Sequence, residues 1–110
     1  MIIQAKELNE FLVAQVQVKE ANLNEAEAFK QKIISIVDEG HKHIIVDFVL
    51  VDYVDSSFLG ALVSALKYAM SKDADISVAH LNKDITNLFE LIRMDKVFRI
   101  YKNLPDNLYD

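Results

Sequence analysis

The sequence predicts a single α/β domain, in which a mixed, mostly parallel sheet of about four or five strands carries three or four packed helices. Two observations support this fold class. Short segments rich in β-formers alternate along the chain with segments of helical periodicity. Residues 43–51, HIIVDFVLV, are almost entirely apolar, which is typical of a strand buried on both faces. The 110 residues are 52% apolar, enough for one core, so we treat 1–110 as one domain.

Two strands are predicted before the first helix. Residues 11–18, FLVAQVQV, are rich in β-formers and end in apolar and polar alternation, which indicates a strand. Ile2 and Ile3 open a shorter strand before it, and residues 7–10 supply the turn between the two. The apolar run over 43–51 follows the first helix and is the predicted central strand.

Three helices are predicted from spacings of three and four between apolar residues. The first covers 23–39, with Asn22 as its N-cap and Gly40 as its stop. The second covers 56–71 and the third 82–93. The residues expected to face the core are Ala26, Phe29, Ile33, Ile36 and Val37 in the first, Phe58, Leu59, Leu62, Val63, Leu66 and Met70 in the second, and Ile85, Leu88, Phe89 and Ile92 in the third.

The remaining segments complete a β-β-α-β-α-β-α-β order. Residues 75–80 and 97–101 are short predicted strands, and 103–110 is a tail or one helical turn. Crossovers in such a chain are right-handed. Functional surfaces of open α/β sheets gather at the carboxyl ends of the strands. Residues 52–57 lie at such an end, directly before the second helix, so we expect the functional site there.

Composition excludes several classes of function. The net charge is −5 and no cluster of Lys and Arg is present, so we expect no direct contact with nucleic acid. No apolar run is long enough for a membrane span, and the N-terminus does not resemble a signal peptide. The absence of cysteine rules out disulfides and suits the cytoplasm, where we expect the protein to act. The sequence does not settle the oligomeric state.

The sequence D-S-S at residues 55–57 has two interpretations. Asp55 is a suitable N-cap that accepts from the backbone N–H of Ser57 or Phe58, and in the simpler interpretation D-S-S only begins a helix. In the functional interpretation Ser56 is phosphorylated, because a phosphate at a helix N-terminus meets free N–H groups and the positive end of the dipole. Ser56 is the more exposed serine if Phe58 points into the core.

The segment IIVDFVLVDYVDSSFLGALV resembles the signature of anti-sigma factor antagonists, which are members of the STAS domain family. In that family an apolar strand ends in a short loop, and D-S-[ST]-G-L-G opens a helix. The later segment DADISVAHLNKDITNLFELIRMDKVFRIY is similar to the family in its order of strand, polar turn, helix and strand. The resemblance spans most of the chain and implies a STAS-like fold.

The resemblance also implies a mechanism. In such proteins a serine kinase that is also the anti-sigma factor phosphorylates the first serine, and only the unphosphorylated protein captures that kinase and frees the sigma factor. Carried over, Ser56 is the phosphoacceptor. We expect Asp55, Ser57, Phe58 and Asn22 to contact the partner, and a serine phosphatase to reset the switch.

The sequence departs from the family pattern at three positions. Phe58 stands where a glycine is usual, and it either alters the surface offered to a partner or fills a gap in the core. Lys19 and Asn22 stand where a glycine and an aspartate usually end the preceding strand. These departures leave open a second function, a STAS-type scaffold or regulatory interaction module without a phosphorylation switch.

We considered three kinds of enzymatic or metal site. Asp47, Asp52 and Asp55 could hold Mg²⁺ at strand ends, or they could serve only in turns, caps and solvent. The three histidines, His41, His43 and His80, lack metal-ligand spacing, and no G-x-S-x-G motif is present. Without a glycine-rich phosphate loop, any phosphate must come from another protein. We therefore expect no enzyme activity, no cofactor and no metal.

Overall fold

The computed structural model of the chain describes residues 1–104, which form a main sheet of five strands in the order β1-β2-β4-β6-β7. Strand β1 pairs with β2 antiparallel, and every other pair in this sheet is parallel. The predicted mixed, mostly parallel sheet is confirmed. The strands are β1 (Ile3–Leu8), β2 (Phe11–Val16), β4 (His43–Asp47), β6 (Asp75–Ala79) and β7 (Ile100–Tyr101).

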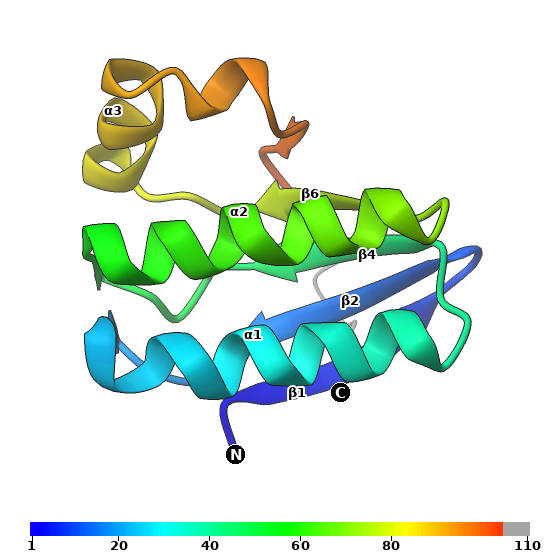
Figure 1. Ribbon diagram of the computed structural model, residues 1–110. Coiled ribbons are helices and arrows are strands. Elements are labelled where there is room, and N and C mark those ends of the chain that lie inside the picture. The colour runs from blue at the N-terminus through cyan, green and yellow to red at the C-terminus, as the bar shows by residue number, and fades with distance from the viewer. Residues whose placement is uncertain (105–110) are drawn as a thin grey trace.

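Helices α1 (Leu23–Asp38) and α2 (Ser56–Ser71) lie side by side over one face of the sheet, and α3 (Lys83–Leu91) lies on the other side of α2 (Figure 1). Each of the three predicted helices is confirmed to within two residues at its ends. The chain then forms a short 3-10 helix, η1 (Met94–Lys96). In the part of the chain that the structure describes, no helix combines the length and apolar character that crossing a bilayer requires.

A row of phenylalanine rings joins all three helices to the sheet. Phe58 of α2 packs against Phe29 of α1, with ring centroids 4.5 Å apart. Phe48, which follows β4, lies 6.4 Å from Phe58 and 6.4 Å from Phe89 of α3. Phe98 extends the row at 6.3 Å from Phe89. The pairs of Phe48 with Phe58 and with Phe89 are edge-to-face, and the other two pairs are tilted. Aromatic pairs in such arrangements add to the stability gained from apolar burial, so the row fixes how the helices sit on the sheet.

The central strand is shorter than the sequence predicts. Strand β4 ends at Asp47, although the apolar run continues to Val51. The Asp47 carboxylate accepts the Val49 N–H at 3.0 Å, and the Val51 N–H donates to the Phe48 carbonyl at 2.9 Å, so the backbone turns here. Phe48 and Val51 are buried within this turn. The apolar run therefore reflects burial of turn residues as well as of a strand.

A second, two-stranded sheet was not predicted. Strand β3 (Glu20–Ala21) pairs in parallel with β5 (Tyr53–Val54). Each strand has only two residues, which is too short to show a period in the sequence. The pair nevertheless joins the end of the segment after β2 to the segment before α2, two parts of the chain more than thirty residues apart.

The prediction is least accurate after α3. The backbone adopts a left-handed conformation at Arg93 (φ 65°), which ends the helix, and Ile92 is 45% exposed instead of facing the core. Met94 is buried in its place. The strand predicted over 97–101 forms only as β7. The tail or helical turn predicted for 103–110 falls mostly outside the described residues.

Candidate functional site

Residues 52–57, the serine corner, lie at the end of the molecule where α1 and α2 begin (Figure 1). Two segments hold its backbone in place. The Asp52 N–H donates to the Lys19 carbonyl at 2.8 Å, next to the β3–β5 pair. The side-chain amide of Asn82, just before α3, donates to the Asp52 carbonyl at 3.1 Å. The corner is therefore anchored from both sides before α2 begins.

Asp55 caps two helices at once. Its Oδ1 accepts the Phe58 N–H of α2 at 2.9 Å, as the sequence predicts for an N-cap. Its Oδ2 accepts the Leu23 N–H at the start of α1, also at 2.9 Å. The backbone N–H of Asp55 donates to the Ala21 carbonyl at 3.1 Å. One carboxylate therefore satisfies unpaired donors of both helices and fixes their first turns relative to each other.

Helices α1 and α3 have asparagine N-caps. Asn22 Oδ1 accepts the Asn24 N–H at 3.0 Å and confirms the predicted cap of α1. Asn82 Oδ1 accepts the Ile85 N–H at 2.8 Å and caps α3. Because Asn82 also bonds the Asp52 carbonyl, the N-terminus of α3 lies close to the serine corner. The positive ends of three helix dipoles therefore converge on one region, which favours an anion there.

The two serines differ in exposure. Ser56, the first residue of α2, is exposed, as expected if Phe58 points inward. Ser57 is half-buried and faces a shallow groove of about 340 Å³ between α1 and α2. Leu23 and Lys30 of α1 line the same groove. Of the two, Ser56 is therefore the hydroxyl that a large partner can reach more easily.

Phe58 fills the core. Its side chain is fully buried, with the ring of Phe29 at 4.5 Å. Of the two alternatives that the sequence leaves open for this residue, filling a core gap is confirmed. The side chain has no exposed surface to offer to a partner, so its influence on the corner is indirect. It holds the first turn of α2 against α1.

Exposed apolar side chains lie near the serine corner, and the sequence did not predict them as part of the site. Leu23 is 68% exposed at the start of α1, and Tyr53 is 56% exposed in β5. Val49 and Leu50, in the turn that leads toward the corner, are 49% and 45% exposed. The only sequence signal is the run of apolar residues beyond the end of β4. Apolar side chains exposed beside a polar site are typical of surfaces that bind other proteins.

The acidic residues considered as a metal site have separate roles. Asp47 is buried, bonds the turn after β4 and lies 2.8 Å from His80 Nδ1. Asp52 is exposed and Asp55 caps helices. His43 bonds Asp75 on another part of the sheet. Among residues 1–104, no three acidic or histidine side chains are grouped as a metal ion would require.

Comparison with known proteins identifies sequence relatives that match most of this chain. A family model described as "Mlab, STAS domain" matches residues 15–104 of this chain. A Thermotoga maritima protein named "Putative anti-sigma factor antagonist" is 25% identical over 89 residues, which cover 80% of this chain and 79% of that protein. The family-model match over residues 15–104 therefore includes α1, α2 and α3, and it runs through the serine corner.

Solved structures show the same fold. An anti-sigma factor antagonist (STAS) domain protein from Planctomyces limnophilus has a TM-score of 0.84 at 14% identity, covering 96% of this chain and 94% of its own. The anti-sigma factor antagonist SpoIIAA in its unphosphorylated form has a TM-score of 0.70 at 15% identity, covering 96% and 91%. Bacillus SpoIIAA in its phosphorylated form has a TM-score of 0.68 at 16% identity, covering 92% of each chain.

Proposed function

This chain belongs to the STAS domain family, and we propose that it acts as an anti-sigma factor antagonist controlled by phosphorylation of Ser56. In the unphosphorylated state it binds an anti-sigma factor that is also a serine kinase, and a sigma factor is released. The kinase then phosphorylates Ser56, binding ends, and a serine phosphatase restores the first state. The protein is a binding partner and not an enzyme, it acts in the cytoplasm, and it does not itself contact nucleic acid.

The observation that carries this proposal is the exposed Ser56 hydroxyl on a corner fixed by Asp55. In the kinase complex the Ser56 oxygen forms a bond to the γ-phosphorus of ATP. The bond to the β-phosphate oxygen breaks, ADP leaves, and the serine proton passes to a base of the kinase. The product carries about −1.5 to −2 charges at neutral pH, and the helix N-termini nearby stabilise them.

Of the four residues predicted to contact the partner, Phe58 loses that role because it is buried, and the other three keep a role at the serine corner. Ser57 is half-buried beside Ser56, and Asn22 is half-buried at the start of α1, so both offer side-chain surface to the kinase. Asp55 orients Ser56 while its carboxylate holds both helices. Phe58 acts from the core by supporting the turn that carries the serines.

The second candidate is a STAS-type scaffold or regulatory module that binds a partner without a phosphorylation switch. The specific observation in its favour is that Asp55 and Asn22 both have structural tasks as helix caps. A serine corner that served only to start α1 and α2 would need the same hydrogen bonds. The two candidates differ in one respect, which is whether Ser56 accepts a phosphate.

We expect a serine kinase of the anti-sigma type from the same genome to transfer one phosphate from ATP to Ser56. The measurement is intact mass of the purified chain after incubation with kinase and ATP, followed by peptide mapping. Ser56→Ala should abolish the added mass, and Ser71→Ala, a control at the exposed serine that ends the same helix, should keep it. A kinase that phosphorylates another STAS protein but leaves this chain unmodified would favour the scaffold.

A further inference from the structure

The side chain of Asn82 joins the N-terminus of α3 to the serine corner. Its Nδ2 donates to the Asp52 carbonyl at 3.1 Å and also reaches the Val51 carbonyl at 3.4 Å. Its Oδ1 accepts the Ile85 N–H at 2.8 Å. Because a backbone N–H can only donate, the atom that faces Ile85 is the oxygen, and the nitrogen faces the two carbonyls. The two ends of one side chain therefore have two different tasks.

The serine corner is held differently on its two sides. On the side of α1, the N–H groups of Asp52 and Tyr53 donate to the Lys19 carbonyl at 2.8 and 3.2 Å. The Asp55 carboxylate adds a bond to the first turn of α1. On the side of α3, Asn82 alone among residues 1–104 donates a hydrogen bond to the corner. Loss of this one donor would release the second side of the corner while the first side stays bonded.

Helix α3 is fixed in place without the help of the Asn82 nitrogen. Its buried residues are Ile85 and Phe89. The Phe89 ring lies 6.4 Å from the Phe48 ring and 6.3 Å from the Phe98 ring. The capping bond to Ile85 uses only the Asn82 oxygen. A substitution that keeps an oxygen at this position but removes the amide donor should therefore leave α3 where it is.

A short and well-fixed stretch of backbone connects the Asp52 carbonyl to Ser56. Strand β5 within it pairs with β3, Val54 is buried, and the Asp55 carboxylate bonds both α1 and α2. Because packed segments transmit small displacements, a shift at Asp52 would be passed on to Ser56. A misplacement of about 1 Å in a reacting group can lower the rate of a transfer step about a hundredfold.

We propose that Asn82 is a positioning residue for phosphorylation of Ser56. Its amide nitrogen holds the Asp52 carbonyl, so α3 determines where the Ser56 hydroxyl meets the ATP bound to the kinase. This inference rests on the proposed function. Asn82 does not touch the reacting atoms and acts through the backbone of residues 52–55. Its oxygen serves the fold, and its nitrogen serves the reaction.

Asn82→Ser separates the two tasks, because serine caps a helix about as well as asparagine but has no amide to reach the Asp52 carbonyl. Hydrogen exchange of the free chain, followed by NMR, should be about fivefold faster at the amides of Asp52 and Tyr53, as loss of one hydrogen bond allows. The amides of residues 86–91 in α3 should keep their wild-type rates. In kinase assays with this chain as the varied substrate, kcat should fall about fivefold or more while KM changes less than about twofold.

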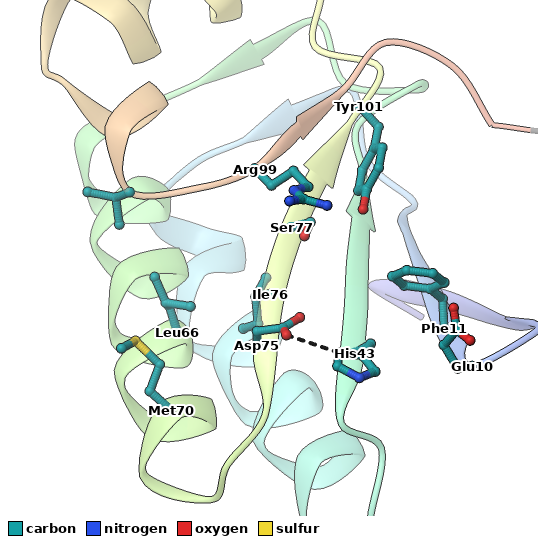
Figure 2. Close-up of a pocket in the computed structure, with 11 residues that line it drawn as sticks. Glu10, Phe11, His43, Leu66, Met70, Asp75, Ile76, Ser77, Arg99 and Tyr101 are labelled. Carbon is teal, nitrogen blue, oxygen red and sulfur yellow. Dashed lines mark hydrogen bonds and ion pairs between the residues drawn. The ribbon is translucent and has the colours of Figure 1, made fainter.

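Asp75→Ala is the matched control, because it also removes one exposed hydrogen bond. The Asp75 carboxylate bonds His43 Nδ1 at 3.0 Å in the groove that Figure 2 shows. Met70, near the C-terminal end of α2, lines the same groove, whereas Ser56 begins that helix. The lost bond is therefore far from the serine corner. This variant should keep the wild-type exchange rates at the corner and the wild-type kcat.

Asn82→Ala removes both ends of the side chain, so it should speed exchange in α3 as well as at the corner. Unchanged exchange at Asp52 and Tyr53 in Asn82→Ser would overturn the proposal, as would an unchanged kcat. A raised KM with unchanged exchange would show that Asn82 contacts the kinase directly and would also overturn it. A wild-type chain that the kinase leaves unmodified would instead refute the proposed function, and the exchange rates would still decide whether Asn82 anchors the corner.

Discussion

A phosphate on Ser56 is expected to weaken binding of the anti-sigma factor kinase about a hundredfold, whereas Ser56→Ala should bind as tightly as the wild type. The hydroxyl is exposed at the first position of α2, so the phosphate adds charge where a partner would lie, without entering the core. A partner surface that fits the neutral serine meets a doubly charged group and loses contacts. Ser56→Asp should reproduce a large part of the loss.

Calorimetric titration of the kinase without ATP measures these affinities. Ser71→Asp is the control, because Ser71 is an exposed serine at the far end of the same helix and gains the same charge. It should bind as the wild type does. The switch would be refuted by a Ser56→Asp variant that binds with unchanged affinity while the fold is intact by circular dichroism.

Phe58→Ala is expected to lower the free energy of unfolding by about 3 to 5 kcal/mol. The ring is fully buried between Phe29 and Phe48, and its removal leaves a cavity where α1, α2 and the turn after β4 meet. Phe58→Gly, which supplies the residue that the family pattern favours, should cost more, because glycine in a helix costs about 1 kcal/mol relative to alanine.

Urea unfolding of purified variants measures this free energy. Tyr53→Ala removes another aromatic ring near the same corner, but that ring is 56% exposed, so we expect a much smaller change. Equal losses for Phe58→Ala and Tyr53→Ala would show that Phe58 does not support the core as described. A smaller slope of the unfolding free energy against urea concentration in Phe58→Ala, but not in Tyr53→Ala, would indicate that the serine corner is less tightly packed in that variant.

Periodicity was sufficient to predict the long elements but not their ends. The spacing of six apolar residues after Asp55 predicts helix α2 with its observed bounds of 56–71. One of the six, Met70, was wrongly expected to face the core, because it is 62% exposed near the end of the helix. Strand β4 was predicted four residues too long. Burial makes the turn residues Phe48 and Val51 as apolar as the strand itself, so composition cannot separate a buried strand from a buried turn.

The sequence predicts where the serine corner lies, but it does not predict all of the hydrogen bonds that hold the corner in place. Local spacing indicates that Asp55 caps α2, since the donor at Phe58 is only three residues away. Nothing local indicates that the same carboxylate bonds Leu23, which is 32 residues earlier in the chain. That bond depends on the β3–β5 pair, and two-residue strands leave no pattern in a sequence. Long-range contacts of this kind arise from the tertiary fold alone.

The most direct test of the central claim is the phosphorylation state of the protein purified from its own host in several growth states. Intact mass is measured before and after phosphatase treatment, with peptides that cover Ser56 and Ser57. We expect a species 80 Da heavier that phosphatase removes, with the phosphate mapped to Ser56. A chain that carries no phosphate in any growth state, with Ser56 covered by peptides, would contradict the switch and favour the scaffold.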